Sequence, residues 1–311
     1  MNLQNVITEK FSDTHTTVKG ETRAWVSPVS LNTLWINTGT LCNLECKNCY
    51  IESSPKNDRL EYISLKEVLT YLEEIQLEGF DTQQIAFTGG EPFMNPSFIA
   101  MVSACLQKNF SVLILTNAMT PMKKRAEELL SLKNKYKEKL SIRVSLDHYT
   151  EELHSEQRGR KSWNGTLEGL RWLFLNEFNF SVAGRSLWNE SDQLARQGFQ
   201  SLFDNMGIKI NCSDPALLIL FPEMSEEKEV PEITTACWDI LKKNPNDIMC
   251  ATSRMVIKRK GQPATVSACT LLPYSQEFEF GETLKSSWKN IYLNHKYCAQ
   301  FCVLGGGSCT T

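Results

Sequence analysis

Strand-like and helix-like segments alternate regularly between Leu34 and about Phe221. Short apolar runs predict six strands, at residues 34–37, 84–87, 111–115, 141–146, 180–184 and 216–221. Stretches with apolar residues three or four positions apart predict helices between them, at residues 65–77, 97–108, 121–132, 163–175 and 191–206. This order is typical of an α/β fold with a parallel sheet and right-handed crossovers. Composition alone permits either a barrel or a doubly wound sheet.

After residue 221 the alternation stops. Residues 221–231 are acidic and contain two prolines, which predicts a linker. Residues 255–269 predict a β-hairpin that turns at Lys260 and Gly261. We therefore expect four parts, which are an N-terminal extension (1–30), a sheet domain (31–222), a linker and helix (223–249) and a small C-terminal domain (250–311).

Composition and charge exclude several classes of protein. The chain has 311 residues, of which 41% are hydrophobic, so it can bury a sizeable core. Its net charge is −3, and nucleic-acid binding is therefore not expected. Residues 1–19 are polar and contain no apolar core of a secretory signal. The longest aliphatic runs have about six residues, far fewer than the roughly twenty that cross a bilayer. We expect a cytoplasmic protein that does not enter the membrane.

The chain has eleven cysteines, although a chain of this length does not need disulfides. In the cytoplasm such a number more often indicates metal or redox chemistry. Eight cysteines form an N-terminal and a C-terminal group, namely Cys42, Cys46 and Cys49, and Cys250, Cys269, Cys298, Cys302 and Cys309. Cys105 lies on the apolar side of a predicted helix and is expected in the core. Cys212 and Cys237 are expected to be structural, and the alternative for Cys237 is a spare ligand or a radical partner.

The first group has the spacing Cys-x3-Cys-x2-Cys and is followed by Tyr50. It forms a short loop directly after the predicted strand 34–37. Three thiolates on one loop can hold three corners of a [4Fe-4S] cluster and leave one iron open to another ligand. Zinc is the alternative, but a closed zinc site needs a fourth Cys or His, and none of the four histidines is near this loop in sequence.

This loop resembles the signature of the radical S-adenosylmethionine (SAM) superfamily, which is the same cysteine spacing followed by an aromatic residue. Thr88-Gly89-Gly90-Glu91-Pro92 is similar to the family's Gly-Gly-Glu-Pro element. The resemblance implies a partial (β/α)6 TIM-like barrel with one side open for substrate. It also implies that the three cysteines hold a SAM-binding [4Fe-4S] cluster. Tyr50, Gly89, Gly90 and Pro92 would contact the cofactor, and Glu91 would accept a hydrogen bond from the methionine amino group.

Polar residues follow further predicted strands. In barrels of this type the carboxyl ends of the strands face the site. The resemblance implies that Asn117, Ser145 and Asp147 contact SAM there, and that Arg185 pairs with its carboxylate. The alternative for each residue is a helix cap or a polar turn residue.

The C-terminal cysteines and the predicted hairpin resemble the twitch domain, a shortened form of the SPASM domain. This implies an auxiliary [4Fe-4S] cluster. Five cysteines compete for its four places, the spacing departs from the longer SPASM pattern, and a second auxiliary cluster is not favoured. Zinc remains an alternative at this position.

The resemblance implies reductive cleavage of SAM to a 5'-deoxyadenosyl radical that abstracts hydrogen from the substrate, with a flavodoxin or ferredoxin as electron donor. An auxiliary cluster favours an oxidative outcome, either dehydrogenation or a cross-link. The substrate is expected to be a small molecule or a peptide. Because only some thirty residues precede the first strand, too few for a leader-peptide-binding domain, a small molecule or short peptide is favoured.

One polar segment after the fourth predicted strand has two interpretations. It contains His148, Tyr149, His154, Arg158 and Arg160. These residues either line the open side of the barrel or form a solvated loop, and the solvated loop is favoured. Two other classes of function also stay open, namely an iron-sulfur electron-transfer or sensor protein without SAM chemistry, and a zinc-stabilised binding module.

Overall fold

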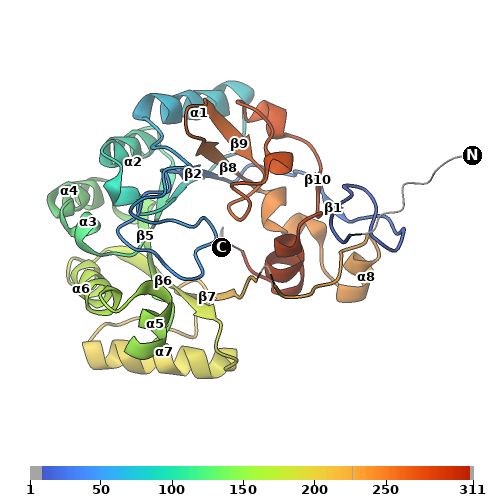
Figure 1. Ribbon diagram of the computed structural model, residues 1–311. Helices are drawn as coiled ribbons and strands as arrows, with labels where there is room; N and C mark the ends of the chain where they lie inside the picture. The colour runs from blue at the N-terminus through green and yellow to red at the C-terminus, as the bar shows by residue number, and fades with distance from the viewer. Residues whose placement is uncertain (1–8, 226, 309–311) are drawn as a thin grey trace, which may run out of the picture.

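The computed structural model describes residues 9–225 and 227–308. An eight-stranded sheet forms its framework, in the order β7-β6-β5-β4-β3-β2-β8-β9 (Figure 1). The strands are β2 (Thr33–Asn37), β3 (Gln84–Thr88), β4 (Ser111–Thr116), β5 (Leu140–Ser145), β6 (Asn179–Ser186), β7 (Leu218–Pro222), β8 (Ser253–Lys258) and β9 (Ala264–Ser267). Strands β2 to β7 are parallel and adjacent in chain order. A doubly wound sheet would reverse its order at a switch point, so the prediction of a partial barrel is confirmed.

Helices follow the strands of the barrel and cover its outer face (Figure 1). They are α1 (Leu65–Glu78), α2 (Phe98–Gln107), α3 (Thr120–Lys123), α4 (Ala126–Tyr136), α5 (Glu151–Arg158), α6 (Ser162–Leu175) and α7 (Asp192–Met206). The single helix predicted over 121–132 is wrong, because the backbone at Arg125 leaves the helical region (φ −110°, ψ 20°) and separates α3 from α4. Helix α5 occupies the segment for which a solvated loop was favoured.

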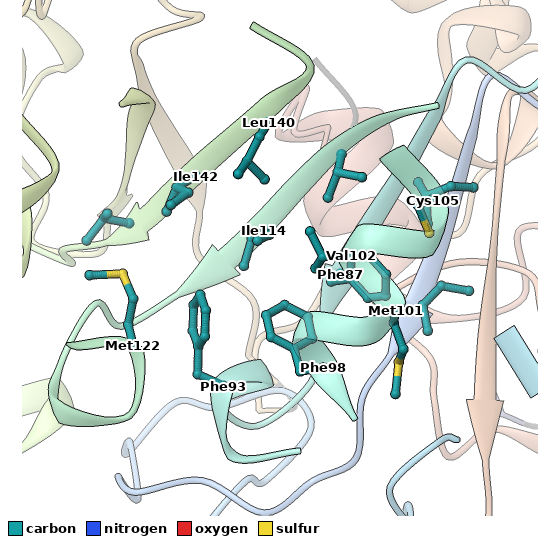
Figure 2. Close-up of a cluster of buried hydrophobic side chains, with 14 of the residues drawn as sticks. Phe87, Phe93, Phe98, Met101, Val102, Cys105, Ile114, Met122, Leu140 and Ile142 are labelled. Atoms are coloured by element: carbon teal, nitrogen blue, oxygen red, sulfur yellow. The ribbon is translucent and has the colours of Figure 1, made fainter. Parts of the chain in front are cut away.

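The strands bury both of their faces. Ile36, Phe87 and Ile114 belong to the larger core, which also contains residues of the helices. Figure 2 shows Phe87 and Ile114 together with side chains of α2. Phe98 packs edge-on against Phe87, with 5.3 Å between ring centroids. Cys105 is fully buried in this core, as predicted. Alternate strand residues point to the inner face of the barrel, where they meet the C-terminal part of the chain.

The hairpin predicted over 255–269 is confirmed, since β8 and β9 pair antiparallel. Strand β8 also pairs in parallel with β2, from Thr33–Ser253 to Ile36–Val256. The C-terminal part therefore extends the sheet of the barrel. Trp35 on β2 packs into the same buried cluster as Cys250 and Cys269.

The remaining elements are short. They are the strands β1 (Trp25–Val26) and β10 (Ile291–Tyr292), the helix α8 (Cys237–Leu241) and a π-helix (Cys298–Leu304), with 3₁₀ turns at Pro92–Met94, Lys137–Lys139, Pro245–Asp247, Met249–Ala251, Gln276–Phe278 and Lys285–Ser287. Strands β1 and β10 form a second, antiparallel sheet. Within the described residues, no helix combines the length and the apolar character that a bilayer span requires.

Candidate active site

A cavity of about 180 Å³ lies at the carboxyl ends of the parallel strands. Most of the residues predicted to bind the first cluster and SAM line this cavity. They are Cys42, Cys46, Cys49, Tyr50, Gly89, Gly90, Asn117, Ser145, Asp147 and Arg185. Because parallel strands all end on the same side of the barrel, residues far apart in sequence meet here.

Backbone hydrogen bonds hold the cysteine loop in place. The Cys42 N–H donates to the Ser54 carbonyl (3.1 Å), and the Lys47 N–H donates to the Gln157 carbonyl at the end of α5 (2.8 Å). Two sulfurs also accept backbone N–H groups. The Leu44 N–H lies 3.4 Å from Cys42 Sγ, and the Ser53 N–H lies 3.4 Å from Cys49 Sγ. Such donors stabilise thiolate charge and tune the potential of a bound cluster.

The three thiols of the cysteine loop could bind either a zinc ion or an iron-sulfur cluster, and their pKa values and arrangement distinguish the two. Burial raises the pKa of Cys42 to about 12 and also raises the pKa of Cys46. These thiols therefore stay protonated until a metal group binds them as thiolates. In residues 9–225 and 227–308, no three His, Cys, Asp or Glu side chains converge on a single ion. A [4Fe-4S] cluster binds each thiolate at a separate iron, so the three cysteines fit a cluster better than zinc.

The two glycines after β3 bring two backbone segments into contact. A Cβ atom on Gly90 would lie 2.1 Å from the Leu41 carbonyl oxygen. Gly89 has a φ of +144°, which glycine adopts without strain. The Gly90 N–H donates to the Gly39 carbonyl (2.7 Å), and the Glu91 N–H donates to the Leu41 carbonyl (3.1 Å). The glycines thus hold the segment that leads into Cys42, besides lining the cavity.

Glu91 is buried and is not among the residues that line the cavity. Its carboxylate accepts hydrogen bonds from Thr116 Oγ1 (2.8 and 3.0 Å), the Asn117 N–H (3.0 Å) and the Phe93 N–H (3.3 Å). Burial raises the pKa of Glu91 to about 7, against these donors. The carboxylate therefore anchors the end of β4, and its contact with the SAM amino group stays a prediction. Pro92 is buried and begins a 3₁₀ turn.

Asn117 and Arg185 connect two strand ends to the cysteine loop. Asn117 Nδ2 donates to Asn43 Oδ1 (2.9 Å). Arg185 Nη1 donates to the Asn48 carbonyl (3.1 Å), and its Nη2 lies 3.5 Å from Glu223 Oε2. Both side chains are polar groups at the cavity wall with partners that fix their position.

The buried Asp147 forms an ion pair with the partly buried Arg158, with Asp147 Oδ1 2.9 Å from Arg158 Nη2. Burial acts to raise the pKa of Asp147, but the guanidinium groups of Arg158 and Arg185 outweigh it, and the pKa lies below its ordinary value. Arg158 also lines the cavity. The favoured interpretation of this segment as a solvated loop is therefore wrong for Arg158.

The same interpretation is wrong for the two histidines of this segment, because both are buried. His148 Nε2 lies 3.0 Å from Glu190 Oε1, and Tyr149 Oη donates to Glu190 Oε2 (3.1 Å). Of the five residues singled out in this segment, only Arg160 is exposed, as a solvated loop requires. The acidic start of α5 and the glycine at 159 are helix signals that sequence reasoning missed.

A second cavity, of about 20 Å³, lies in the C-terminal part. Cys250, Cys269, Cys298 and Cys302 all line it, and the rest of its wall is aliphatic or aromatic. Burial raises the pKa of Cys250 to about 11. Burial, and then the neighbouring thiols of Cys269 and Cys250, raise the pKa of Cys298 well above its ordinary value. The predicted ligand Cys309 lies outside the described residues.

The other cysteines line neither cavity. Cys212 is buried in the helix-side core, and Cys237 is half-buried, with its sulfur 3.4 Å from the Thr234 N–H. Sequence reasoning missed the apolar wall of the first cavity, which includes Phe221, Met224, Leu271 and Phe301. These four come from three separate segments, and no local pattern marks them. Leu271 lines both cavities.

Comparisons with known proteins agree with this geometry. Residues 36–184 match the family described as the radical SAM superfamily. The antilisterial bacteriocin subtilosin biosynthesis protein AlbA of Bacillus subtilis is 37% identical over 120 residues, a match that covers 39% of this chain and 25% of that protein.

Solved structures show the same fold. The structure of anSMEcpe with bound AdoMet has a TM-score of 0.58 at 17% identity, covering 82% of this chain and 77% of that one. Streptococcus suis SuiB bound to its precursor peptide SuiA has a TM-score of 0.54 at 15% identity, covering 85% of this chain and 65% of that one. This chain therefore matches only a quarter of the length of AlbA and about two thirds of SuiB.

Proposed function

From the premise that this chain belongs to the radical SAM superfamily, we propose that it is a peptide maturase that cleaves SAM reductively. When bound and reduced, the cluster supplies the electron that cleaves SAM to methionine and a 5'-deoxyadenosyl radical, which abstracts hydrogen from the substrate. The observation that carries this proposal is the joint placement of three cysteine thiols, the Gly89-Gly90 backbone and four polar strand-end residues around one cavity.

The residues of the chain would bind and orient SAM. Cys42, Cys46 and Cys49 would hold three irons and leave the fourth for the methionine amino and carboxylate groups. Arg185 would pair with the carboxylate, since it lines the cavity and its ion pair with Glu223 is long, at 3.5 Å. The other strand-end residues would accept and donate hydrogen bonds to the rest of SAM. Arg158 is already paired with Asp147 and would instead hold that carboxylate in place.

We further propose that the second cavity holds one auxiliary [4Fe-4S] cluster. The four cysteines in its wall supply one thiolate for each iron, so no iron is left open for substrate. A closed cluster in an apolar cavity suits electron acceptance, which favours an oxidative outcome such as dehydrogenation or a cross-link. Electrons for SAM cleavage would come from a flavodoxin or ferredoxin.

A peptide substrate is supported by two relatives rather than by local sequence. AlbA takes part in bacteriocin biosynthesis, and SuiB binds a precursor peptide. In this chain, Phe221, Met224 and Phe301 form an apolar wall beside the SAM residues. We propose that an uncharged side chain of the peptide packs against this wall and presents its hydrogen to the radical.

The experiment is anaerobic reconstitution of the full chain, followed by iron counting and electron paramagnetic resonance. We expect about eight irons per chain, as two cubane clusters require, and a spectral change of one cluster when SAM is added. The variant Cys46→Ala should lose about four irons and all 5'-deoxyadenosine formation. The control Cys212→Ala removes a buried thiol of the helix-side core that lines neither cavity, and it should retain both properties.

An iron-sulfur protein without SAM chemistry is the alternative, and the same experiment tests it. That protein would give cluster spectra that do not respond to SAM. Formation of 5'-deoxyadenosine by the Cys46→Ala variant would contradict the cysteine assignment. The auxiliary ligands are tested separately by Cys298→Ala, which should lose the second cluster and keep the SAM-dependent spectrum of the first.

A further inference from the structure

Arg254 on β8 is one of the largest fully buried side chains in the described part of the chain. Its guanidinium donates only to backbone carbonyls. Nη1 donates to the carbonyls of Cys250 (2.5 Å) and Ser253 (2.7 Å), while Nε and Nη2 donate to the Ser287 carbonyl (3.2 and 3.1 Å). Each of the three guanidinium nitrogens thus has a hydrogen-bond acceptor, but none of these acceptors carries a negative charge.

No carboxylate in residues 9–225 and 227–308 lies within ion-pair distance of Arg254. Arg23 is also among the largest fully buried side chains, and it shows the usual arrangement of a buried arginine, an ion pair with a carboxylate. Its Nη2 lies 2.6 Å from Glu232 Oε1, and both side chains are buried. A buried charge without an opposite charge destabilises the folded protein. Arg254 therefore needs a counter-ion, and no carboxylate of the described residues supplies it.

Within the described residues, Arg254 interacts electrostatically with two cysteine thiols that can become negative, Cys250 and Cys269. Cys250 lies four residues before it and offers it a carbonyl, and Cys250 lines the second cavity together with Cys269. Negative charge on Cys250 or Cys269 would attract this guanidinium. The Cys250 carbonyl therefore holds the guanidinium close to a residue that lines the cavity.

We propose that Arg254 is the built-in counter-cation of the auxiliary cluster. This inference rests on the auxiliary cluster of the proposed function. A [4Fe-4S]²⁺ core with four thiolates carries a net charge of −2, and one-electron reduction makes it −3. The cavity wall is otherwise apolar, so Arg254 offsets part of a charge that its surroundings cannot solvate.

A fixed positive charge favours the reduced, more negative cluster over the oxidised one. Arg254 therefore raises the reduction potential of the auxiliary cluster and makes it a better acceptor for the electron that the substrate radical gives up when it is oxidised. It acts on the cluster through charge and touches no reacting atom, which makes it a positioning and tuning residue.

The test is a redox titration of the reconstituted full chain, followed by electron paramagnetic resonance of the auxiliary cluster. Three variants are compared with the unmodified chain. Arg254→Gln removes the charge, Arg254→Lys keeps the charge but changes the hydrogen-bond fork, and Lys258→Gln removes a cation from the same strand. Lys258 is paired with Glu67 (3.0 Å) and does not line the cavity, so it controls for a general change of charge.

We expect a more negative midpoint potential for Arg254→Gln than for the unmodified chain, a midpoint near the unmodified value for Arg254→Lys, and no shift for Lys258→Gln. An unchanged midpoint in Arg254→Gln, or equal shifts in Arg254→Gln and Arg254→Lys, would overturn the inference. If Arg254→Gln fails to hold the cluster, Arg254→Lys decides. Normal cluster content in the Arg254→Lys variant supports a role of the positive charge. Loss of the cluster in both variants to the same extent contradicts it.

Failure of the proposed function would look different. The unmodified chain would then carry only about four irons, and Cys298→Ala would change neither its iron content nor its spectrum. A chain with both clusters but without an effect of Arg254 on the potential would contradict this inference alone.

Discussion

Replacing Gly90 with alanine puts a methyl group into the contact between the backbone after β3 and the backbone before Cys42. The new Cβ would lie 2.1 Å from the Leu41 carbonyl oxygen and 2.7 Å from the Thr40 carbonyl oxygen. Ordinary contacts of a Cβ begin near 3.4 Å, so the Leu41 carbonyl must move by about 1.3 Å (3.4 − 2.1). Neither neighbour is the end of a flexible side chain, and the backbone itself must shift.

The size of the effect follows from what this movement breaks. Overpacking of a close contact costs about 1–3 kcal/mol. The hydrogen bonds from the Gly90 N–H to Gly39 and from the Glu91 N–H to Leu41 contribute about 1 kcal/mol each. The sum is a loss of about 3–5 kcal/mol in the free energy of unfolding, a large part of the roughly 5–15 kcal/mol of a typical domain.

Urea unfolding of the cluster-free chain measures this loss, and iron counting after reconstitution measures its effect on the site. Because Leu41 adjoins Cys42, we expect the Gly90→Ala variant to hold less of the first cluster. The control is Gly79→Ala, where φ is +69° and no atom lies within 4 Å of the new Cβ. It should cost only about 1–2 kcal/mol, from the left-handed backbone, and keep full iron content.

The reasoning is refuted if Gly90→Ala unfolds at the same urea concentration as the unmodified chain and binds the same amount of iron. It is also refuted if both variants lose stability and iron equally, because the close approach to Leu41 would then have no particular role.

Two further predictions concern buried polar groups. Asp147→Asn leaves the partly buried Arg158 without its partner and should lower the free energy of unfolding by about 2 kcal/mol at pH 7. Because the pKa of Asp147 is lowered in the folded chain, this difference is present above its unfolded pKa near 3.9 and disappears as the pH falls through the folded value, which urea unfolding at several pH values measures. Cys105→Ser puts a hydroxyl into the helix-side core and should cost about 1–3 kcal/mol with unchanged iron content, whereas loss of iron would contradict a purely structural role.

Much of the cavity could be predicted because its parts are local in sequence. Each strand is an apolar run that ends in a polar residue, so Asn117, Ser145 and Asp147 were expected at the same end of the barrel. The cysteine spacing is local in the same sense. What joins these parts is the parallel order of the strands, which the alternation of strands and helices indicates.

Other features depend on contacts between distant residues. The burial of His148 depends on Glu190, 42 positions further along the chain. The Glu91 carboxylate is directed toward hydrogen-bond donors at the end of β4. No local pattern in the sequence shows that it points there and not into the cavity. The set of four cysteines at the second cavity likewise depends on how the segment after residue 269 folds back onto β8.

The pairing of β2 with β8 has a consequence for biosynthesis. The last residues of these strands, Asn37 and Lys258, are 221 positions apart (258 − 37). At a typical synthesis rate of about 5–20 residues per second, β2 waits on the order of ten to forty seconds for its partner. All five of its residues are buried in the finished protein. During that time the nascent chain presents an apolar strand with open hydrogen-bonding groups, a template for association with other chains. A segment made late therefore protects a strand made early, and a chain cut short before Ser253 would expose this edge permanently.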